Sequence, residues 1–285
     1  MNTLRLPTSE GGTELYTLHG TPVDASPLAP SHSRTAFAAV HVVADPTAPN
    51  GPDQPARLDW EATLAFRHHL WDLGLGVADA MDTAQRGMGL DWPATAELIQ
   101  RSGAEAVARG AALACGVNTD QLTSTHADLE SVVSAYEEQL DVVQNAGATP
   151  VIMASRVLAA GAQGPQDYTK VYGHLLRRAD RPVILHWLGT AFDPALAGYW
   201  GYTDPAQAVE PVAELITEHA EKVEGIKVSL LDSSLEVRLR RLLPEGVRLY
   251  TGDDFHYPEL ILGDEQGHSD ALLGIFAAIG PAAAQ

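Results

Sequence analysis

The chain has 285 residues, of which 45% are hydrophobic, and its 37 acidic against 18 basic residues give a net charge of -19. This charge argues against nucleic acid and anionic membranes as partners, because phosphate binding needs a basic surface. The single cysteine, Cys115, excludes an internal disulfide and is typical of a reducing cytoplasm. No apolar run approaches the roughly 20 residues of a membrane span. We therefore expect a cytoplasmic protein.

The first 34 residues are predicted to form a β-hairpin and a linker. Residues 3–6 and 14–18 alternate apolar with polar side chains, and the Ser-Glu-Gly-Gly sequence of residues 9–12 favours a turn between them. Residues 21–34 are rich in proline and read as a linker. We expect this segment, residues 1–34, to precede a second unit that covers residues 35–285.

From residue 35 onward, short apolar stretches alternate with helical ones. The apolar stretches lack polar alternation, which is typical of strands that are buried on both faces. Predicted strands cover residues 35–43, 76–80, 111–116, 150–154, 182–187, 223–229, 247–251 and 271–274. Predicted helices cover residues 60–73, 91–109, 128–146, 165–179, 205–221, 233–243 and 256–263.

This alternation predicts an α/β fold, a parallel (β/α)8 TIM barrel. An open doubly wound sheet is the alternative, although it would want a Gly-x-Gly-x-x-Gly sequence at the first strand–helix turn, which the chain lacks. No eighth helix is predicted, because only residues 282–285 remain after Gly280 and Pro281. With the C-terminal helical segment short or absent, we expect that the hairpin or a partner chain, as in a homo-oligomer, covers that side, or that the chain is a shortened version of something longer.

One lysine lies in an unusual place. The chain has three lysines against fifteen arginines, and Lys227 lies between Ile226 and Val228 in the predicted strand 223–229. A buried ammonium is costly unless it is paired or its pKa falls. A lysine with a lowered pKa is the nucleophile of Schiff-base chemistry on carbonyl compounds. The alternative is a structural lysine whose ammonium only reaches the end of a strand.

Charged and polar residues gather where the predicted strands end. Barrel active sites form at the C-terminal ends of the strands, so these residues can be taken as a set. The set comprises Asp45, Asp79, Asp82, Thr83, Cys115, Asn118, Asp120, Ser155, Arg156, His186, Lys227, Asp253, Asp254 and His256. Its content of Asp, His, Arg and Lys predicts a charged pocket at the mouth of the barrel.

Two short stretches carry a resemblance to a known superfamily. Gly225-Ile226-Lys227 and, one strand later, residues 251–254 (Thr-Gly-Asp-Asp) resemble dihydrodipicolinate synthase and N-acetylneuraminate lyase. Residues 41–46 and 80–89 resemble a branch of that superfamily whose function is not assigned. The resemblance covers about residues 35–281. It implies a class I aldolase-type barrel whose strand-six lysine forms a Schiff base with a 2-oxo acid, a homo-oligomer, and no cofactor beyond that lysine.

The sequence departs from the superfamily at two places. Its members carry Gly-Thr-Thr or Gly-Thr-Ser after strand two to hold the substrate carboxylate, whereas residues 80–83 here read Ala-Met-Asp-Thr. Asp82 would repel a carboxylate, because like charges at close range are unfavourable. Members also use a tyrosine after strand four as a proton shuttle, where this chain has Ser155 and Arg156. These departures favour a neutral polyhydroxylated carbonyl substrate over plain pyruvate.

The predicted roles follow from these residues. Lys227 would form the imine, and His186 or a water molecule would move the proton, since histidine titrates near neutral pH. Substrate hydroxyls or a terminal anion would be bound by Asp82, Thr83, Arg156, Asp253 and Asp254. For Asp253 and Asp254 the alternatives are a turn carboxylate and a helix cap ahead of His256.

Two other functions remain open from the sequence. A metal-dependent barrel isomerase, epimerase or hydrolase could take Mg²⁺, Mn²⁺ or Zn²⁺ ligands from Asp79, Asp82, His186, Asp254, His256 and His268. No compact histidine spacing supports that reading. The barrel could instead have lost catalysis and serve binding or assembly. The aromatic residues 199–202 would form a lid over the pocket or a contact between subunits.

Overall fold

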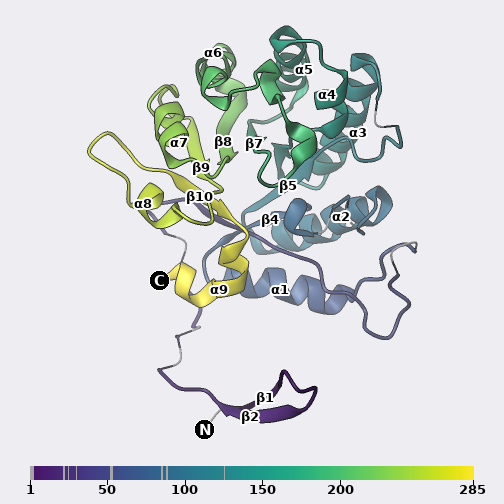
Figure 1. Cartoon of the computed structure of the whole chain (residues 1–285), viewed down its shortest axis with the longest axis vertical. Helices are drawn as coiled ribbons and strands as arrows, with labels where there is room; N and C mark the ends of the chain where they lie inside the picture. The colour runs from purple at the N-terminus through teal and green to yellow at the C-terminus, as the bar shows by residue number, and fades with distance from the viewer. Residues whose placement is uncertain are drawn as a thin grey trace.

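The computed structural model describes residues 3–21, 23–24, 26–29, 31–51, 54–84, 86–87, 89–124 and 126–285. Eight parallel strands close into a barrel in the order β10-β3-β4-β5-β6-β7-β8-β9, with helices around the outside (Figure 1). The predicted barrel is confirmed, and the open sheet is wrong. The predicted loop at residues 83–89 includes Gln85 and Met88, which lie outside the described residues.

The barrel strands lie close to their predicted positions. They are β3 (Ala36–Ala39), β4 (Gly76–Asp79), β5 (Leu113–Val117), β6 (Thr149–Ile152), β7 (Val183–Leu188), β8 (Val223–Ser229), β9 (Arg248–Thr251) and β10 (Asp270–Leu273). The first is shorter than predicted. After Ala39 the chain leaves the sheet, and Val43 exchanges hydrogen bonds with Asp59 and Thr63 at the start of the next helix instead.

The helices begin where the sequence supplies caps. The main ones are α1 (Trp60–Asp72), α2 (Trp92–Arg109), α3 (Leu129–Asn145), α5 (Pro165–Arg178), α6 (Val209–Glu218), α7 (Ser233–Arg240) and α8 (Tyr257–Leu262). The carboxylates of Asp59, Asp91 and Asp128 each accept a backbone N–H from the first turn of α1, α2 and α3. The predicted helix 205–221 is broken into α6 and two flanking 3-10 turns.

Two further helices correct the sequence interpretation. The Gly- and Ala-rich stretch after β6 forms α4 (Arg156–Gly161), because the Ser155 hydroxyl accepts the Leu158 N–H at 3.0 Å and caps it. An eighth barrel helix is present as α9 (Ile275–Ala284), which continues through Pro281 and packs beside β3. The burial of its apolar residues Phe276 and Ala277 stabilises this helix by more than Pro281 destabilises it. The C-terminal helical segment is short, as predicted.

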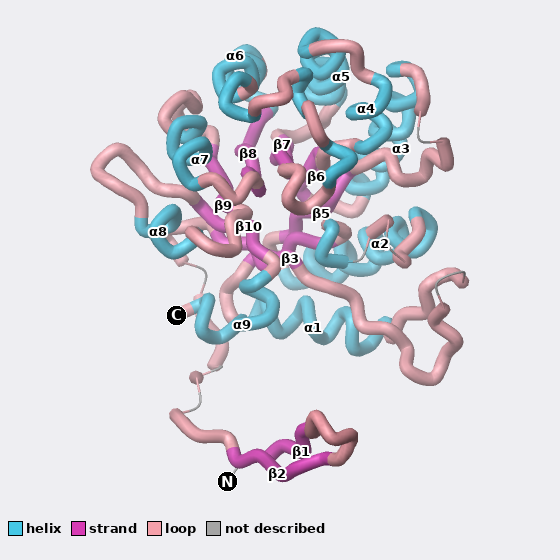
Figure 2. Tube along the Cα trace, in the orientation of Figure 1, coloured by secondary structure: helices cyan, strands magenta, loops and turns pink. Residues whose placement is uncertain are grey.

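The N-terminal hairpin lies apart from the barrel (Figure 2). Strands β1 (Thr3–Pro7) and β2 (Thr13–Thr17) pair antiparallel, with Thr3 opposite Thr17. Leu4 and Tyr16 are opposite each other and remain 48% and 44% exposed. The linker, in contrast, contacts the barrel body, where the Leu28 N–H donates to the Asp72 carbonyl at 2.8 Å.

The core is sorted into two layers by strand alternation. One cluster fills the barrel interior and includes Phe37, Val151, Met153, Ile184 and Tyr250, while a larger one packs the outer face of the strands against the helices. Successive side chains of a strand point to opposite faces. Thus Ile226 and Val228 of β8 belong to the outer layer, and Lys227 faces the interior. Within the described residues, no helix is both long and apolar enough to span a membrane.

Candidate active site

Lys227 lies at the inner face of β8 and is 9% exposed. Burial lowers the pKa of its amine, and the nearby carboxylates of Asp82 and Asp254 oppose that shift. Among the described residues, no side chain closes a salt bridge with it. A buried amine with a lowered pKa and no tight partner is more nucleophilic than a solvated surface lysine.

Gly252 at the end of β9 makes room for this side chain. A Cβ added there would lie 2.7 Å from Lys227 Cε and 3.0 Å from the Val228 carbonyl, and it would overlap the Ser229 hydroxyl. Any residue larger than glycine would therefore push the lysine out of its position. The sequence resemblance included Gly252 only as part of a motif, and this steric role was missed.

His186 is the neighbour of Lys227 across the strand pair. The two residues are in register between β7 and β8, so their side chains share the interior face. His186 is fully buried, its Nε2 lies 3.3 Å from Ser229 Oγ, and its Nδ1 has no partner among the described residues. Burial, together with the positive charge of Lys227, lowers the pKa of His186 well below its usual value. The imidazole is therefore neutral, and the same shift makes it a weak proton acceptor.

Asp82 follows β4 on a strained turn. Ala80 has a φ of 52°, which is unusual for a residue other than glycine, and the chain then enters a 3-10 turn over Asp82–Ala84. Asp82 is half-buried, and burial raises the pKa of its carboxyl while Lys227 and Arg86 act in the opposite sense. Thr83 instead lies against Gly274 at the end of β10.

A buried arginine that the sequence analysis missed fixes the loops around Asp82. Arg86 donates from Nε and Nη2 to the carboxylate of Asp120, at 3.0 and 2.7 Å. Its Nη1 donates to the carbonyls of Ala80 and Gly116, and Nη2 also meets Gln139. Although burial would raise it, these bonds hold the pKa of Asp120 below its usual value. Arg86 therefore ties the turn after β4 to the end of β5.

A cavity of about 380 Å³ opens among these loops. Its polar wall includes Asp82, Asn118, Thr119, Ser124, Arg156 and Asp193. Arg156 is 60% exposed, and its Nε lies 2.5 Å from Asp193 Oδ2, which joins α4 to the loop after β7. The structure thus brings the predicted residues Asp82 and Arg156 to one cavity; Lys227 does not belong to its lining, although the Asp82 carboxylate acts electrostatically on the Lys227 amine.

Several hydroxyl groups lie near the end of β6, where members of the superfamily carry a tyrosine and this chain has Ser155 and Arg156. Thr119 Oγ1 lies 2.6 Å from Ser155 Oγ, and the Ser155 N–H donates to the Tyr199 hydroxyl at 3.1 Å. The Tyr199 and Tyr172 hydroxyls lie 2.8 Å apart. Tyr199 and Trp200 are buried against α5 and belong to the core, whereas Gly201 is exposed and Tyr202 partly exposed, so a lid or subunit contact at residues 199–202 stays a prediction.

Two predicted mouth residues serve the scaffold instead. Asp79 faces the helices, where its carboxylate accepts Arg67 Nε at 3.0 Å, Arg67 Nη2 at 2.8 Å and the Ser102 hydroxyl at 2.6 Å. Asp253 accepts the backbone N–H groups of Phe255 and His256 and lies 3.0 Å from His256 Nδ1. Asp253 is therefore the turn carboxylate of the two acids, and Asp254 is the one that acts electrostatically on Lys227.

The alternative metal set is not assembled. Its members Asp79, His186, Asp254 and His256 include two that are engaged as just described and one, His186, that is enclosed in the barrel interior. The part of the chain that the structure describes holds no group of three His, Cys, Asp or Glu side chains that could hold a metal ion. His268 precedes β10 and therefore lies at the end of the barrel opposite the mouth.

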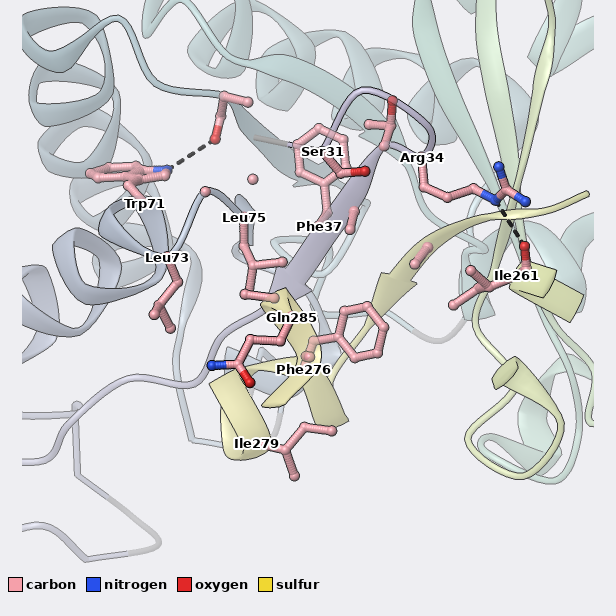
Figure 3. Close-up of a pocket in the computed structure, with 18 of the residues that line it drawn as sticks. Ser31, Arg34, Phe37, Trp71, Leu73, Leu75, Ile261, Phe276, Ile279 and Gln285 are labelled. Carbon is pink, nitrogen blue, oxygen red and sulfur yellow. Dashed lines mark hydrogen bonds between the residues drawn. The ribbon is translucent and has the colours of Figure 1, made fainter. Parts of the chain in front are cut away.

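A larger cavity, of about 600 Å³, lies at that opposite end (Figure 3). Its wall is mainly apolar and comes from α1, α8, α9 and the starts of β3 and β4; Phe37, Leu75 and Phe276 are examples. Arg34 at its side donates from Nε to the Ile261 carbonyl at 2.8 Å. None of the predicted site residues lines it, so we place the candidate active site at the mouth.

The sequence matches one family from residue 4 to residue 285, which is described as "Protein of unknown function (DUF993)". The chain belongs to the DUF993 family. A comparison with curated proteins finds no match.

Solved structures share the fold of this DUF993 member. Dihydrodipicolinate synthase from Aquifex aeolicus is 13% identical, with a TM-score of 0.60 over 88% of this chain and 77% of that one. The 2-keto 3-deoxygluconate aldolase from Picrophilus torridus is 14% identical, with a TM-score of 0.60 over 86% and 74%. YagE from E. coli K12, a prophage protein of the dihydrodipicolinic acid synthase family solved with pyruvate, is 15% identical, with a TM-score of 0.61 over 87% and 72%. These similarities confirm the predicted superfamily resemblance at the level of the fold.

Proposed function

We propose that the chain is a class I aldolase-type lyase whose Lys227 forms a Schiff base with a carbonyl compound, either a polyhydroxylated sugar-derived compound or a 2-oxo acid. The observation that carries this proposal is the buried Lys227 amine near the mouth end of β8, which forms no salt bridge with another described residue and for which Gly252 leaves room. The reaction needs no cofactor beyond this lysine. The acidic charge and single cysteine support a cytoplasmic location, and the superfamily resemblance supports a homo-oligomer.

The reaction begins at the neutral amine, which the lowered pKa of Lys227 makes accessible. The amine attacks the carbonyl carbon, and the carbinolamine loses water to give a protonated imine. The imine then accepts the electron pair of a breaking carbon–carbon bond while a β-hydroxyl loses its proton, so that an aldehyde leaves and an enamine remains. Protonation of the enamine and hydrolysis release the second product and restore Lys227.

The surrounding residues would assist these steps. Forming the imine creates a positive charge in a buried place, where the carboxylates of Asp82 and Asp254 act favourably on it. His186 or a water molecule would carry the proton. His186 lies 3.3 Å from the Ser229 hydroxyl, and because its lowered pKa makes it a weak base, it would pass the proton on and not hold it. Asp82, Thr83 and Arg156 would orient substrate hydroxyls or a terminal anion, with Asp254 at the rim.

Reductive trapping tests the imine. The protein is incubated with a panel of hydroxyketones, aldehydes and 2-oxo acids in the presence of cyanoborohydride, and adducts are located by peptide mass spectrometry. We expect an adduct on Lys227 that disappears in Lys227→Met and persists in Lys170→Met, which removes an exposed lysine on α5. Absence of any Lys227 adduct across the panel would contradict the proposed function.

A further inference from the structure

We propose that the N-terminal hairpin docks on a second copy of this chain, where its apolar face covers the cavity of about 600 Å³ at the end of the barrel opposite the mouth. Each copy supplies one hairpin and one cavity, so two copies can exchange their hairpins reciprocally. This inference goes beyond the proposed function, because it concerns the assembly of the chain and not the reaction at Lys227.

One face of the hairpin is apolar. In the antiparallel register Leu4 is opposite Tyr16 and Leu6 is opposite Glu14. Residues that are opposite each other, or two apart in one strand, share a face of the sheet. Leu4, Leu6 and Tyr16 therefore lie on the same face, and all three are exposed. The opposite face carries three threonines and an arginine, so the apolar face is the one that gains most from burial.

The hairpin is poorly supported by its own chain. Among the described residues, no backbone hydrogen bond joins residues 3–21 to the barrel, and the hairpin lies apart from the barrel in Figures 1 and 2. A two-stranded hairpin alone is marginally stable in water. Both of its strands are also edge strands, whose free N–H and carbonyl groups favour further pairing or burial. A partner surface would therefore stabilise the hairpin.

The cavity at the opposite end of the barrel offers a matching apolar surface. Its wall includes Phe37, Leu75 and Phe276, which Figure 3 labels, together with the alanines at the end of α9. Ile261 and Ile279 of the same wall are only partly buried. Burial of apolar surface is the main favourable contribution to most protein association. The hairpin face and this wall can therefore cover each other.

The two surfaces also match in charge. Glu14 lies on the apolar face of the hairpin, and Arg34 lies at the side of the cavity. Arg34 donates to main-chain carbonyls but forms no salt bridge with any described residue. The described wall of the cavity carries no acidic side chain, although the chain has 37 acidic residues. A second copy that brings Glu14 to this wall thus meets a cation and no like charge.

The linker favours a second copy over the hairpin's own barrel. The Gln285 side chain donates to the Asp24 carbonyl at 2.8 Å, and the Leu28 N–H donates to the Asp72 carbonyl, so the linker is held beside the cavity at residues 24 and 28. Leu18 comes only six residues before Asp24, a span of about 20 Å at most. To cover its own cavity, the hairpin would have to reverse direction within this span. Docking on another molecule needs no such reversal.

Photo-cross-linking tests this docking. A benzophenone maleimide is attached at Ala282→Cys, an exposed position of α9 that lines the cavity, whereas the natural Cys115 is buried and does not react. After illumination, a denaturing gel separates covalent dimers from monomers, and mass spectrometry identifies the linked peptides. We expect covalent dimers in which the probe has reacted with residues 3–18 of the other copy. The same probe at Lys170→Cys, an exposed position of α5 outside the cavity wall, should give none of these dimers.

Two variants are matched across the faces of the hairpin. Leu6→Asp places a carboxylate on the apolar face and should lower the yield of these dimers by about tenfold or more, because a buried unpaired charge is costly. Leu15→Asp places the same charge on the opposite face and should leave the yield unchanged. Hairpin cross-links within a single chain, their absence from every product, or an equal yield in Leu6→Asp and wild type would each overturn the proposal. Circular dichroism and thermal unfolding verify that the barrel of each variant is folded.

Discussion

The two ends of the barrel hold cavities of opposite character. The mouth cavity, of about 380 Å³, is lined by acids, hydroxyls and two arginines, and one of its acids, Asp82, acts electrostatically on Lys227. The cavity at the other end, of about 600 Å³, is larger and mainly apolar, and its one arginine donates to main-chain carbonyls. The larger cavity thus offers apolar surface, whereas the smaller one offers polar and charged side chains. This difference predicts that substitutions at the two ends affect different properties of the protein.

The largest effect is expected at Gly252. Gly252→Ala would place a methyl group against Lys227 Cε, and we expect imine trapping to slow by about 100-fold or more, since small misplacements of a reacting group are costly. The rate of adduct formation measures this. Gly51→Ala is the control, because a Cβ there meets nothing within 4 Å. A Gly252→Ala protein that traps substrate at the wild-type rate would contradict the steric role.

At the apolar end, the expected effect is on stability. Phe276 is buried between α9 and the barrel and packs on Tyr257 at the wall of the larger cavity. We expect Phe276→Ala to lower the free energy of unfolding by about 3 kcal/mol, measured by urea denaturation, and to leave the rate of Lys227 trapping under native conditions unchanged. A parallel loss of trapping would mean that the two ends are coupled.

The pH dependence of trapping should show how burial and the Asp82 carboxylate each change the pKa of Lys227. Because burial lowers the pKa of Lys227, the rate of adduct formation should rise with pH through a midpoint below that of an ordinary lysine. Asp82 opposes that shift, so Asp82→Asn should move the midpoint to still lower pH. Trapping at saturating carbonyl compound from pH 6 to pH 10 measures both midpoints, and a midpoint that moves upward in Asp82→Asn would contradict this electrostatic arrangement.

The smallest effect concerns the stability cost of the lysine itself. The folded protein holds Lys227 with a pKa below its unfolded value, so at neutral pH, where the unfolded chain keeps the lysine charged, burial of the ammonium opposes folding. Lys227→Met should therefore raise the free energy of unfolding by about 1 kcal/mol. The gain should shrink as pH rises towards the unfolded pKa. Chemical denaturation at pH 7 and at pH 9.5 measures it, and a loss of stability at pH 7 would count against a desolvated amine.

Much of the architecture could be read from local sequence. Apolar stretches without alternation gave seven of the barrel strands nearly to the residue. The predicted starts of helices 60–73, 91–109 and 128–146 lie within one residue of the observed ones, where Asp59, Asp91 and Asp128 act as caps. These features are local, since a cap or a buried strand depends on a few neighbouring side chains. The helices α4 and α9 were missed, because their stability comes from a single serine cap and from burial against β3.

By itself, the sequence determined the strand–helix alternation and the position of Lys227 on the sixth barrel strand. The sequence could not show which of the charged residues at the strand ends face the mouth of the barrel. Asp79 and Asp82 are three residues apart, yet one faces Arg67 among the helices and the other faces the cavity, because strand alternation and the strained turn at Ala80 aim them differently. The links of Arg86 to Asp120 and Gln139, and the space that Gly252 leaves for Lys227, join residues far apart in the chain. Only the closed barrel brings such residues within contact distance, so the tertiary structure alone decided which of the charged residues surround the lysine.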